Sequence, residues 1–285
     1  MRPARALAPA LLLVVASCGG SSLVSDDPPA ATPYDGPLQL AISGDETAPI
    51  AQRAGAAARA LECDHPPQTG GGGDYDGGLA STQDSAEDAL QNSFDEDGRG
   101  ATLPSTDYRV ERRDDDRVLF SYDVDGRTRV SFIAYRGVKD FNRDTGWGIE
   151  SWASCDPSEL PASVTDGLNI GVWQDASGRR VLTDTVLSFD GSEHCAWQDI
   201  TFVQLGPGPD DPEYVRDPAG KLAEQLTGPF DDSGELPPSA LDTGFRRDGR
   251  ELWLAADRSA AYLVDIADPR DVEVWPASRS QISCA

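Results

Sequence analysis

The alternation of apolar and polar side chains is the feature that most constrains the fold of this chain. From Tyr108 onward, apolar residues recur at every second position, most clearly over residues 118–124. Successive side chains of a strand point to opposite faces, so this period predicts strands with one buried face. Asp125-Gly126 then predicts a tight hairpin, because both residue types tolerate the positive φ of a type I′ turn. The pattern therefore predicts antiparallel sheets.

The region before Tyr108 has helical signals instead. Residues 47–61 are rich in alanine, which predicts a short helix ending near Cys63. Residues 81–94 carry apolar side chains at four-residue spacing and acidic side chains near their start, so a second helix is predicted there. Residues 66–73 are rich in Pro and Gly and are predicted to be a loop.

The second half of the chain is mostly strand-like. Strands are predicted over residues 169–173, 180–189, 199–205, 252–255, 261–266 and 272–275. Residues 219–227 are predicted to form one short helix, and Pro157 and Pro161 mark a boundary between the halves. The predicted fold class is α+β, with antiparallel sheets, few helices and two sheet-containing halves, each closed by a disulfide.

The N-terminus has the layout of an export signal. Arg2 and Arg5 supply positive charge, and residues 6–15 form an apolar run. That run is about half of the roughly 20 apolar residues that cross a bilayer, so a spanning helix is not expected. Residues 1–17 are therefore predicted to be a signal peptide.

The predicted signal ends in Val15-Ala16-Ser17-Cys18. This motif resembles the lipobox of bacterial lipoproteins, in which an aliphatic residue and two small residues precede a cysteine. The resemblance implies cleavage before Cys18, a diacylglycerol thioether on its sulfur and anchoring to the outer face of the cell membrane. The alternative is an ordinary secretory signal that contains a cysteine. The two acyl chains of a diacylglycerol suffice for stable attachment, whereas one chain binds only marginally.

Residues 18–37 are rich in Gly, Ser, Pro and Asp, and are predicted to be a flexible tether carrying the lipid. Residues 38–160 are predicted to form a helix-plus-antiparallel-sheet domain, and residues 161–285 a mainly β domain. The formal net charge of −25 argues against a nucleic-acid partner, because binding phosphates requires clustered Lys and Arg.

Four cysteines remain once Cys18 is assigned to the lipid, namely Cys63, Cys155, Cys195 and Cys284. An even number outside the cytoplasm predicts disulfides, for which three pairings are possible. We expect Cys63 to pair with Cys155 and Cys195 with Cys284, because each bond would then close one half of the chain.

Several short blocks in the second half look like recurring segments of uncharacterised secreted proteins and lipoproteins from high-GC Gram-positive bacteria. They are Glu193-His194-Cys195-Ala196-Trp197-Gln198, Tyr214-Val215-Arg216-Asp217-Pro218, Leu252-Trp253-Leu254, Ala261-Tyr262-Leu263-Val264 and Val272-Glu273-Val274-Trp275-Pro276. The resemblance covers roughly residues 165–285 and implies export from a bacterial host, but no activity.

The sequence has no GxSxG, SxxK, HExxH or GxxxxGK[ST] motif, and only two histidines. No catalytic residue and no cofactor is therefore predicted. Forty-nine acidic residues make some carboxylate pair inevitable, so none can be singled out as a glycosidase pair.

The sequence offers candidate ligands for two metals, zinc and calcium. Zinc would need the cysteines beside His65 and His194, but their spacings lack the CxxC and HxxxH forms. Calcium could bind the Asp-x-Asp-Gly runs at residues 74–77, 95–98 and 123–126, yet these lack the later ligands of an EF-hand. Turns in which Asp bonds its own backbone are the simpler interpretation of these runs, and no metal site is predicted.

Six tryptophans could stack on envelope sugars, or they could pack in the core, which is commoner for aromatic residues in strands. The leading hypothesis is a membrane-anchored, non-enzymatic module that engages an envelope protein or glycan. The alternative is a carboxylate-dependent hydrolase acting on cell-envelope material. A cleft with two facing carboxylates would favour the enzyme, and an apolar surface the binding module.

Overall fold

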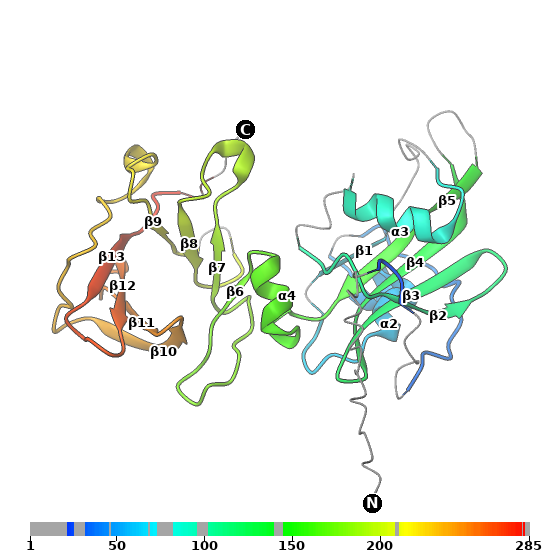
Figure 1. Ribbon diagram of the computed structural model, residues 1–285, viewed down its shortest axis with the longest axis horizontal. Coiled ribbons are helices and arrows are strands. Elements are labelled where there is room, and N and C mark those ends of the chain that lie inside the picture. Colours follow the sequence, from blue (N-terminus) through cyan, green and yellow to red (C-terminus); the bar gives the residue numbers. More distant parts are fainter. Residues whose placement is uncertain are drawn as a thin grey trace, which may run out of the picture.

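The computed structural model describes residues 22–25, 32–45, 47–67, 69–72, 82–95, 102–139, 145–208, 211–280 and 282. These residues form one five-stranded and two four-stranded antiparallel sheets. The larger sheet lies in one half of the molecule and the smaller two in the other, with helix α4 (Ala162–Gly167) between them (Figure 1). The prediction of antiparallel sheets with few helices is therefore confirmed.

The five-stranded sheet has the order β1-β5-β4-β3-β2. Its strands are β1 (Thr69–Gly72), β2 (Arg109–Arg113), β3 (Arg117–Val124), β4 (Arg127–Lys139) and β5 (Thr145–Ser154). The predicted hairpin joins β3 to β4, with Asp125 at φ 52° and Gly126 at φ 74°. These positive φ angles match the right-handed twist of the two strands, which is why Asp-Gly is favoured there.

One face of this sheet is covered by helix α2 (Gly55–Ala60), which follows the single turn α1 (Ile50–Arg53). The predicted helix over 47–61 is thus present but broken at Gly55, whose φ is +53°. Small alanine side chains let α2 approach the sheet closely, so the Ser131 hydroxyl can donate a hydrogen bond to the Ala57 carbonyl at 2.6 Å.

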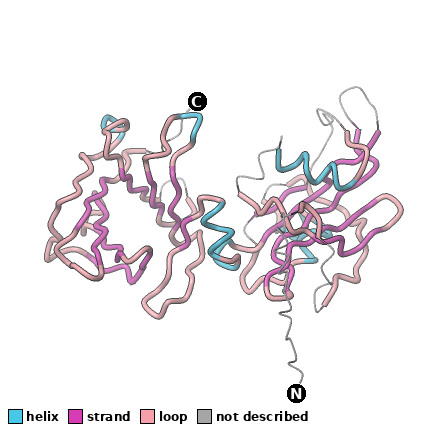
Figure 2. Tube along the Cα trace, in the orientation of Figure 1, coloured by secondary structure: helices cyan, strands magenta, loops and turns pink. Residues whose placement is uncertain are grey.

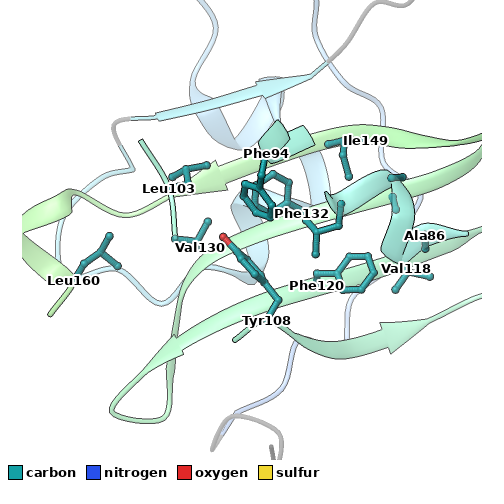
Figure 3. Close-up of a cluster of buried hydrophobic side chains, with 13 residues drawn as sticks. Ala86, Phe94, Leu103, Tyr108, Val118, Phe120, Val130, Phe132, Ile149 and Leu160 are labelled. Atoms are coloured by element: carbon teal, nitrogen blue, oxygen red, sulfur yellow. The ribbon is translucent and has the colours of Figure 1, made fainter. Parts of the chain in front are cut away.

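The other face is covered by helix α3 (Ala86–Asp95), within the segment predicted to be helical. The hydroxyl of Ser85 accepts a hydrogen bond from the Asp88 backbone N–H at 3.0 Å, which satisfies a free donor in the first turn. Phe94 packs edge-on against Phe132 of β4 with ring centroids 5.5 Å apart (Figure 3). This aromatic cluster forms the main core of the half.

The loop prediction for residues 66–73 was wrong, because Thr69–Gly72 forms the edge strand β1 beside β5. Glycine lowers strand propensity because it has no side chain to pack. An edge strand, however, is held by backbone hydrogen bonds to its neighbour, so a Gly-rich segment can be recruited once that neighbour is in place.

The Cys63–Cys155 disulfide is present as predicted, with Cα atoms 5.4 Å apart. Beside it, the buried Arg129 guanidinium donates hydrogen bonds to Asp64, at 2.9 Å, and to Glu159. Cys195 is also disulfide-bonded, but its predicted partner Cys284 lies outside the described residues. The described residues therefore contain one complete disulfide, and the Cys195–Cys284 pairing stays a prediction.

The other half has two sheets, with the orders β6-β7-β8-β9 and β10-β11-β12-β13. Their strands are β6 (Gly171–Val172), β7 (Leu187–Asp190), β8 (Thr201–Gln204), β9 (Glu213–Arg216), β10 (Leu241–Arg247), β11 (Arg250–Leu254), β12 (Ala260–Asp265) and β13 (Val272–Pro276). The strand predicted over 180–189 is shorter than expected, β9 and β10 were not predicted, and the helix predicted over 219–227 is only the 3-10 turn η4 (Ala223–Gln225).

The two four-stranded sheets face one another and are joined at both edges. Gln174, just after β6, exchanges two backbone hydrogen bonds with Arg246 of β10, at 2.8 and 2.9 Å. At the other seam a bridge links Tyr214 of β9 to Ala277, just after β13. The strands therefore lie around a common centre, and we call this arrangement the cylinder (Figure 2). Its interior holds Trp173, Tyr214, Trp275 and smaller apolar side chains.

No helix among the described residues has both the length and the apolar character needed to cross a membrane. The predicted signal peptide at residues 1–17 and the lipidation site Cys18 lie outside the described part of the chain.

Candidate functional site

Asp156 bridges the two halves of the molecule. It is fully buried, and its carboxylate accepts hydrogen bonds from the Ser158 backbone N–H at 2.8 Å and from the Thr183 hydroxyl at 2.8 Å. The Thr183 backbone N–H donates to it as well, at 3.1 Å. A buried carboxylate that accepts several hydrogen bonds is well compensated for its lost hydration. This bridge therefore joins the end of the five-stranded sheet to the segment that leads into β7.

Helix α4 is the second connecting element, and its C-terminal end fixes a corner of the junction. Asn169 takes the left-handed conformation with φ 57°, and the Ile170 N–H bonds back to the Thr165 carbonyl at 2.8 Å, as in a helix ending of the Schellman type. The Asn169 side chain then pairs with the backbone of Asp190, donating to its carbonyl at 3.2 Å and accepting from its N–H at 3.1 Å. The helix end is thereby attached to β7.

An apolar cavity of about 910 Å³ lies at this junction. One wall comes from the first half, with Leu103, Pro157 and Leu160 beside the disulfide residue Cys155. The opposite wall comes from the second half, and its apolar members are Leu168, Ile170, Leu187 and Phe189. Leu187 and Phe189 alternate with Ser188 along β7 and so lie on the outer face of the cylinder.

Polar residues border one side of the cavity. Glu193 and His194 belong to the 3-10 turn η3 (Glu193–Cys195), which ends at Ala196 in the left-handed conformation. Ser192, Thr183 and Gln198 also line the cavity. Cavities of roughly 300–1,000 Å³ with apolar walls and a few polar groups are typical of small-molecule sites. The arrangement can hold an apolar group while offering hydrogen bonds at its border.

A second, polar hollow of about 320 Å³ lies at one open end of the cylinder. Residues from seven of the eight strands line it, and Gly171 of the remaining strand, β6, lies against Arg247. We call the following residues the mouth ring. They are Gly171, Asp190, Thr201, Arg216, Arg247, Arg250, Leu263 and Glu273. Strand register supports this grouping, because Asp190 pairs with Thr201, Thr201 with Arg216, Leu263 with Glu273 and Arg247 with Arg250.

The carboxylates of the mouth ring lie beside cations and hydrogen-bond donors of the protein. Glu273 lies 3.6 Å from Arg216 and 3.8 Å from Arg250, and accepts a hydrogen bond from the Trp275 indole at 2.8 Å. Asp190 accepts from the Thr201 hydroxyl at 2.9 Å.

The structure brings few of the metal candidates together. Cys63, Cys155 and Glu159 are the one described group with suitable atoms within 4.8 Å, but both sulfurs are used in the disulfide. Residues 74–77 and most of 95–98 lie outside the described residues. In the run 123–126, Asp123 bonds to Arg109 at 2.6 Å and to Thr128 at 2.9 Å, which supports the interpretation as a hairpin turn.

Most of the tryptophans follow the expectation of core packing. Trp173 and Trp275 are buried inside the cylinder, and their indole N–H groups donate to Ser188 and Glu273 respectively. The other four, Trp147, Trp152, Trp197 and Trp253, are partly exposed. Trp147, Trp152 and Trp197 nevertheless pack against buried clusters, so core packing is the role of five of the six tryptophans.

No family model, no curated protein and no solved structure matches this chain.

Sequence reasoning missed both sites. One signal for the cavity is Pro161, because proline commonly precedes or begins a helix. Helix α4 follows it directly and ends before Leu168. For the mouth ring, Asp248-Gly249 offered the same hairpin signal as Asp125-Gly126, with φ of 50° and 77°, and would have revealed β10. No local signal identifies which strands meet at the seams.

Proposed function

We propose that this protein is a lipid-anchored module of the bacterial cell envelope that binds, without chemistry, the apolar part of an amphiphilic envelope molecule or partner. The observation that carries the proposal is the apolar cavity between the two halves. The lipid anchor rests on the resemblance of residues 15–18 to a lipobox. The membrane is thus the first partner, and an envelope molecule is the second.

The composition of the cavity supports an amphiphile over a bare glycan. Its walls are leucine, isoleucine, proline and phenylalanine, which gain free energy by covering apolar surface. Burial of such surface contributes about 25 cal/mol per Å², so a chain of several methylene groups would supply useful affinity. The border residues Glu193, His194 and Gln198 could receive a polar head.

A fluorescent fatty acid, dansyl-undecanoate, tests this site directly. We expect saturable binding with enhanced dansyl emission. Ile170→Trp fills the cavity and should weaken binding by about tenfold, because a loss of about 1.4 kcal/mol of contact corresponds to that factor. Leu241→Trp is the matched control, since Leu241 is 54% exposed and outside the cavity. Equal binding by both variants, or none by the wild type, would contradict the proposal.

The anchor and the second disulfide are tested together by the intact mass of protein extracted from its native membrane. The expected mass is that of residues 18–285 plus lipid, and reduction of Cys63–Cys155 and Cys195–Cys284 should raise it by four hydrogens. Cys18→Ser should release the protein from the membrane. An unlipidated mass would remove the anchor, while leaving the cavity proposal to be judged by its own experiment.

The hydrolase alternative has less support. The carboxylates of the mouth ring interact with arginines, hydroxyls or an indole, and Asp248 at its edge lies 3.4 Å from Arg247. An acid catalyst would require one carboxyl group in surroundings that favour its protonated form.

A further inference from the structure

Three arginines line the pocket inside the mouth ring. They differ in how many hydrogen bonds their guanidinium groups make to other residues of the protein. Arg250 is committed, because its guanidinium donates to the Leu263 carbonyl at 3.0 Å and to Asp271 at 3.2 Å. The pocket walls are likewise satisfied, since the indoles of Trp173 and Trp275 each donate to a neighbouring side chain. Arg216 and Arg247 are the exceptions.

The guanidinium of Arg247 is held in position, but few of its hydrogen-bond donors have a partner. A Cβ on Gly171 would collide with Nη1 of Arg247, so the guanidinium lies directly against the backbone of β6. Its one ion pair joins Nε to Asp248 at 3.4 Å, and the Asp248 side chain is 78% exposed. Its two Nη atoms donate no hydrogen bond to the described residues. The same side chain also lines two smaller hollows beside the pocket.

Arg216 faces the same pocket from β9. Its nearest carboxylate oxygen, on Glu273, is 3.6 Å away, beyond good hydrogen-bond distance. Its guanidinium lies 5.3 Å from the centre of the Phe230 ring. This cation–π contact restricts the motion of the side chain but occupies none of its N–H donors. The side chain is 37% exposed, so solvent and small solutes can reach it.

The local charge differs from that of the whole molecule. The pocket is lined by three arginines and three carboxylates, so its lining is formally neutral in a chain whose formal net charge is −25. A guanidinium presents N–H donors in a planar fork that matches the two oxygens of a carboxylate or of a phosphate. Arg216 and Arg247 face the same hollow with free N–H donors, which is the arrangement that binds an oxyanion.

We propose that the mouth of the cylinder is a binding site for an oxyanion carried on a small polar molecule, of which an acidic sugar is the best fit. The volume of about 320 Å³ limits the ligand to roughly the size of one monosaccharide. Asp190 and Thr201, beside the arginines in the ring, offer acceptors and a hydroxyl to sugar hydroxyl groups. The site differs from the junction cavity, because of the two Ser188 of β7 lines only the mouth pocket and Leu187 and Phe189 line only the junction cavity, while Asp190 borders both.

The test is isothermal titration calorimetry of the full chain with glucuronate, inorganic phosphate and glucose. We expect saturable binding of glucuronate and none of glucose. Arg247→Gln should weaken binding by about tenfold or more, since hydrogen bonds to charged groups contribute that much. Arg247→Lys keeps the charge but loses the fork and should bind with intermediate affinity. Arg270→Gln, at an arginine 90% exposed and outside the pocket, should bind like the wild type.

The outcomes separate cleanly. Phosphate that competes with glucuronate would assign the site to oxyanions in general, and phosphate that fails to compete would assign it to carboxylates; both support the proposal. Equal binding of glucose, unchanged binding by Arg247→Gln, or no binding of either anion would overturn it. Circular dichroism spectra of the variants would exclude misfolding as the cause of a loss. Binding of dansyl-undecanoate reports the junction cavity independently, so the failure of one proposal leaves the other standing.

Discussion

The two halves of this molecule use the same material, antiparallel strands, to make opposite kinds of interior. In the first half a single sheet is covered by α2 on one face and α3 on the other, and its core closes over Phe94 and Phe132. In the second half, two sheets turn their inner faces toward each other and leave a polar hollow at one end. The two cavities described above lie at the junction and in the second half.

The arginines show the same difference. In the first half, Arg117 holds Glu150 with two hydrogen bonds of 2.7 and 2.9 Å, and Arg129 holds both Asp64 and Glu159. Both side chains are buried. In the second half, the contacts of Arg216 and Arg247 to carboxylates of described residues are 3.6 and 3.4 Å long, and both side chains are partly exposed. A buried arginine with complete partners stabilises a fold, whereas a fixed arginine with free donors is ready for a ligand.

The largest expected effect comes from Phe132→Ala in the closed core. Phe132 is fully buried against Phe94, Tyr108 and Trp152, so we expect a loss of about 3–5 kcal/mol in the free energy of unfolding, measured in urea. Leu241→Ala, at an exposed site, should change it by less than about 0.5 kcal/mol. The predicted boundary at residues 160–161 implies that the two halves unfold separately. In that case the fluorescence of the cylinder tryptophans would report a second unfolding transition, whose urea midpoint is the same in Phe132→Ala as in the wild type.

A smaller effect is expected at the link between the halves. Asp156→Ala would leave the Thr183 N–H and hydroxyl and the Ser158 N–H without their acceptor, which should cost about 1–3 kcal/mol. Because the link also positions the cavity walls, binding of dansyl-undecanoate should weaken as well. Asp184→Ala is the control, since Asp184 is exposed near the same segment. Unchanged stability and binding would show that the halves do not depend on this bridge.

The smallest effect is a pH dependence confined to the first half. Hydrogen bonds from Arg127 and Arg129 lower the pKa of Asp64 below its ordinary value of 3.8. A carboxyl with a depressed folded pKa contributes stability above the unfolded pKa, and that contribution is lost as the pH falls through 3.8 toward the folded value. The wild type should therefore unfold at a higher temperature than Asp64→Asn near about pH 7, with the gap narrowing by about pH 3. Asp115→Asn, at an exposed turn residue, should track the wild type; a constant gap for Asp64→Asn would contradict the assignment.

Local patterns predicted the elements whose interactions are local. The β3–β4 hairpin follows from alternation on both sides of Asp125-Gly126, and α3 follows from four-residue spacing behind an acidic start. The helix predicted over 219–227 failed because only a single 3-10 turn forms there, with Leu222 and Leu226 buried against Phe202 and Val215. Packing against a neighbouring sheet overrides a weak helix propensity.

What the sequence alone determined is the alternation that makes sheets and the hairpin turns that connect neighbouring strands. It also predicted correctly that Cys63 pairs with Cys155. What only the tertiary structure decided is which distant segments meet: Gln174 with Arg246, Tyr214 with Ala277, and the guanidinium of Arg247 against Gly171. The physical reason is that turns and periodicity act over a few residues, whereas the seams of the cylinder depend on backbone pairing between strands far apart in the chain, which no local pattern encodes.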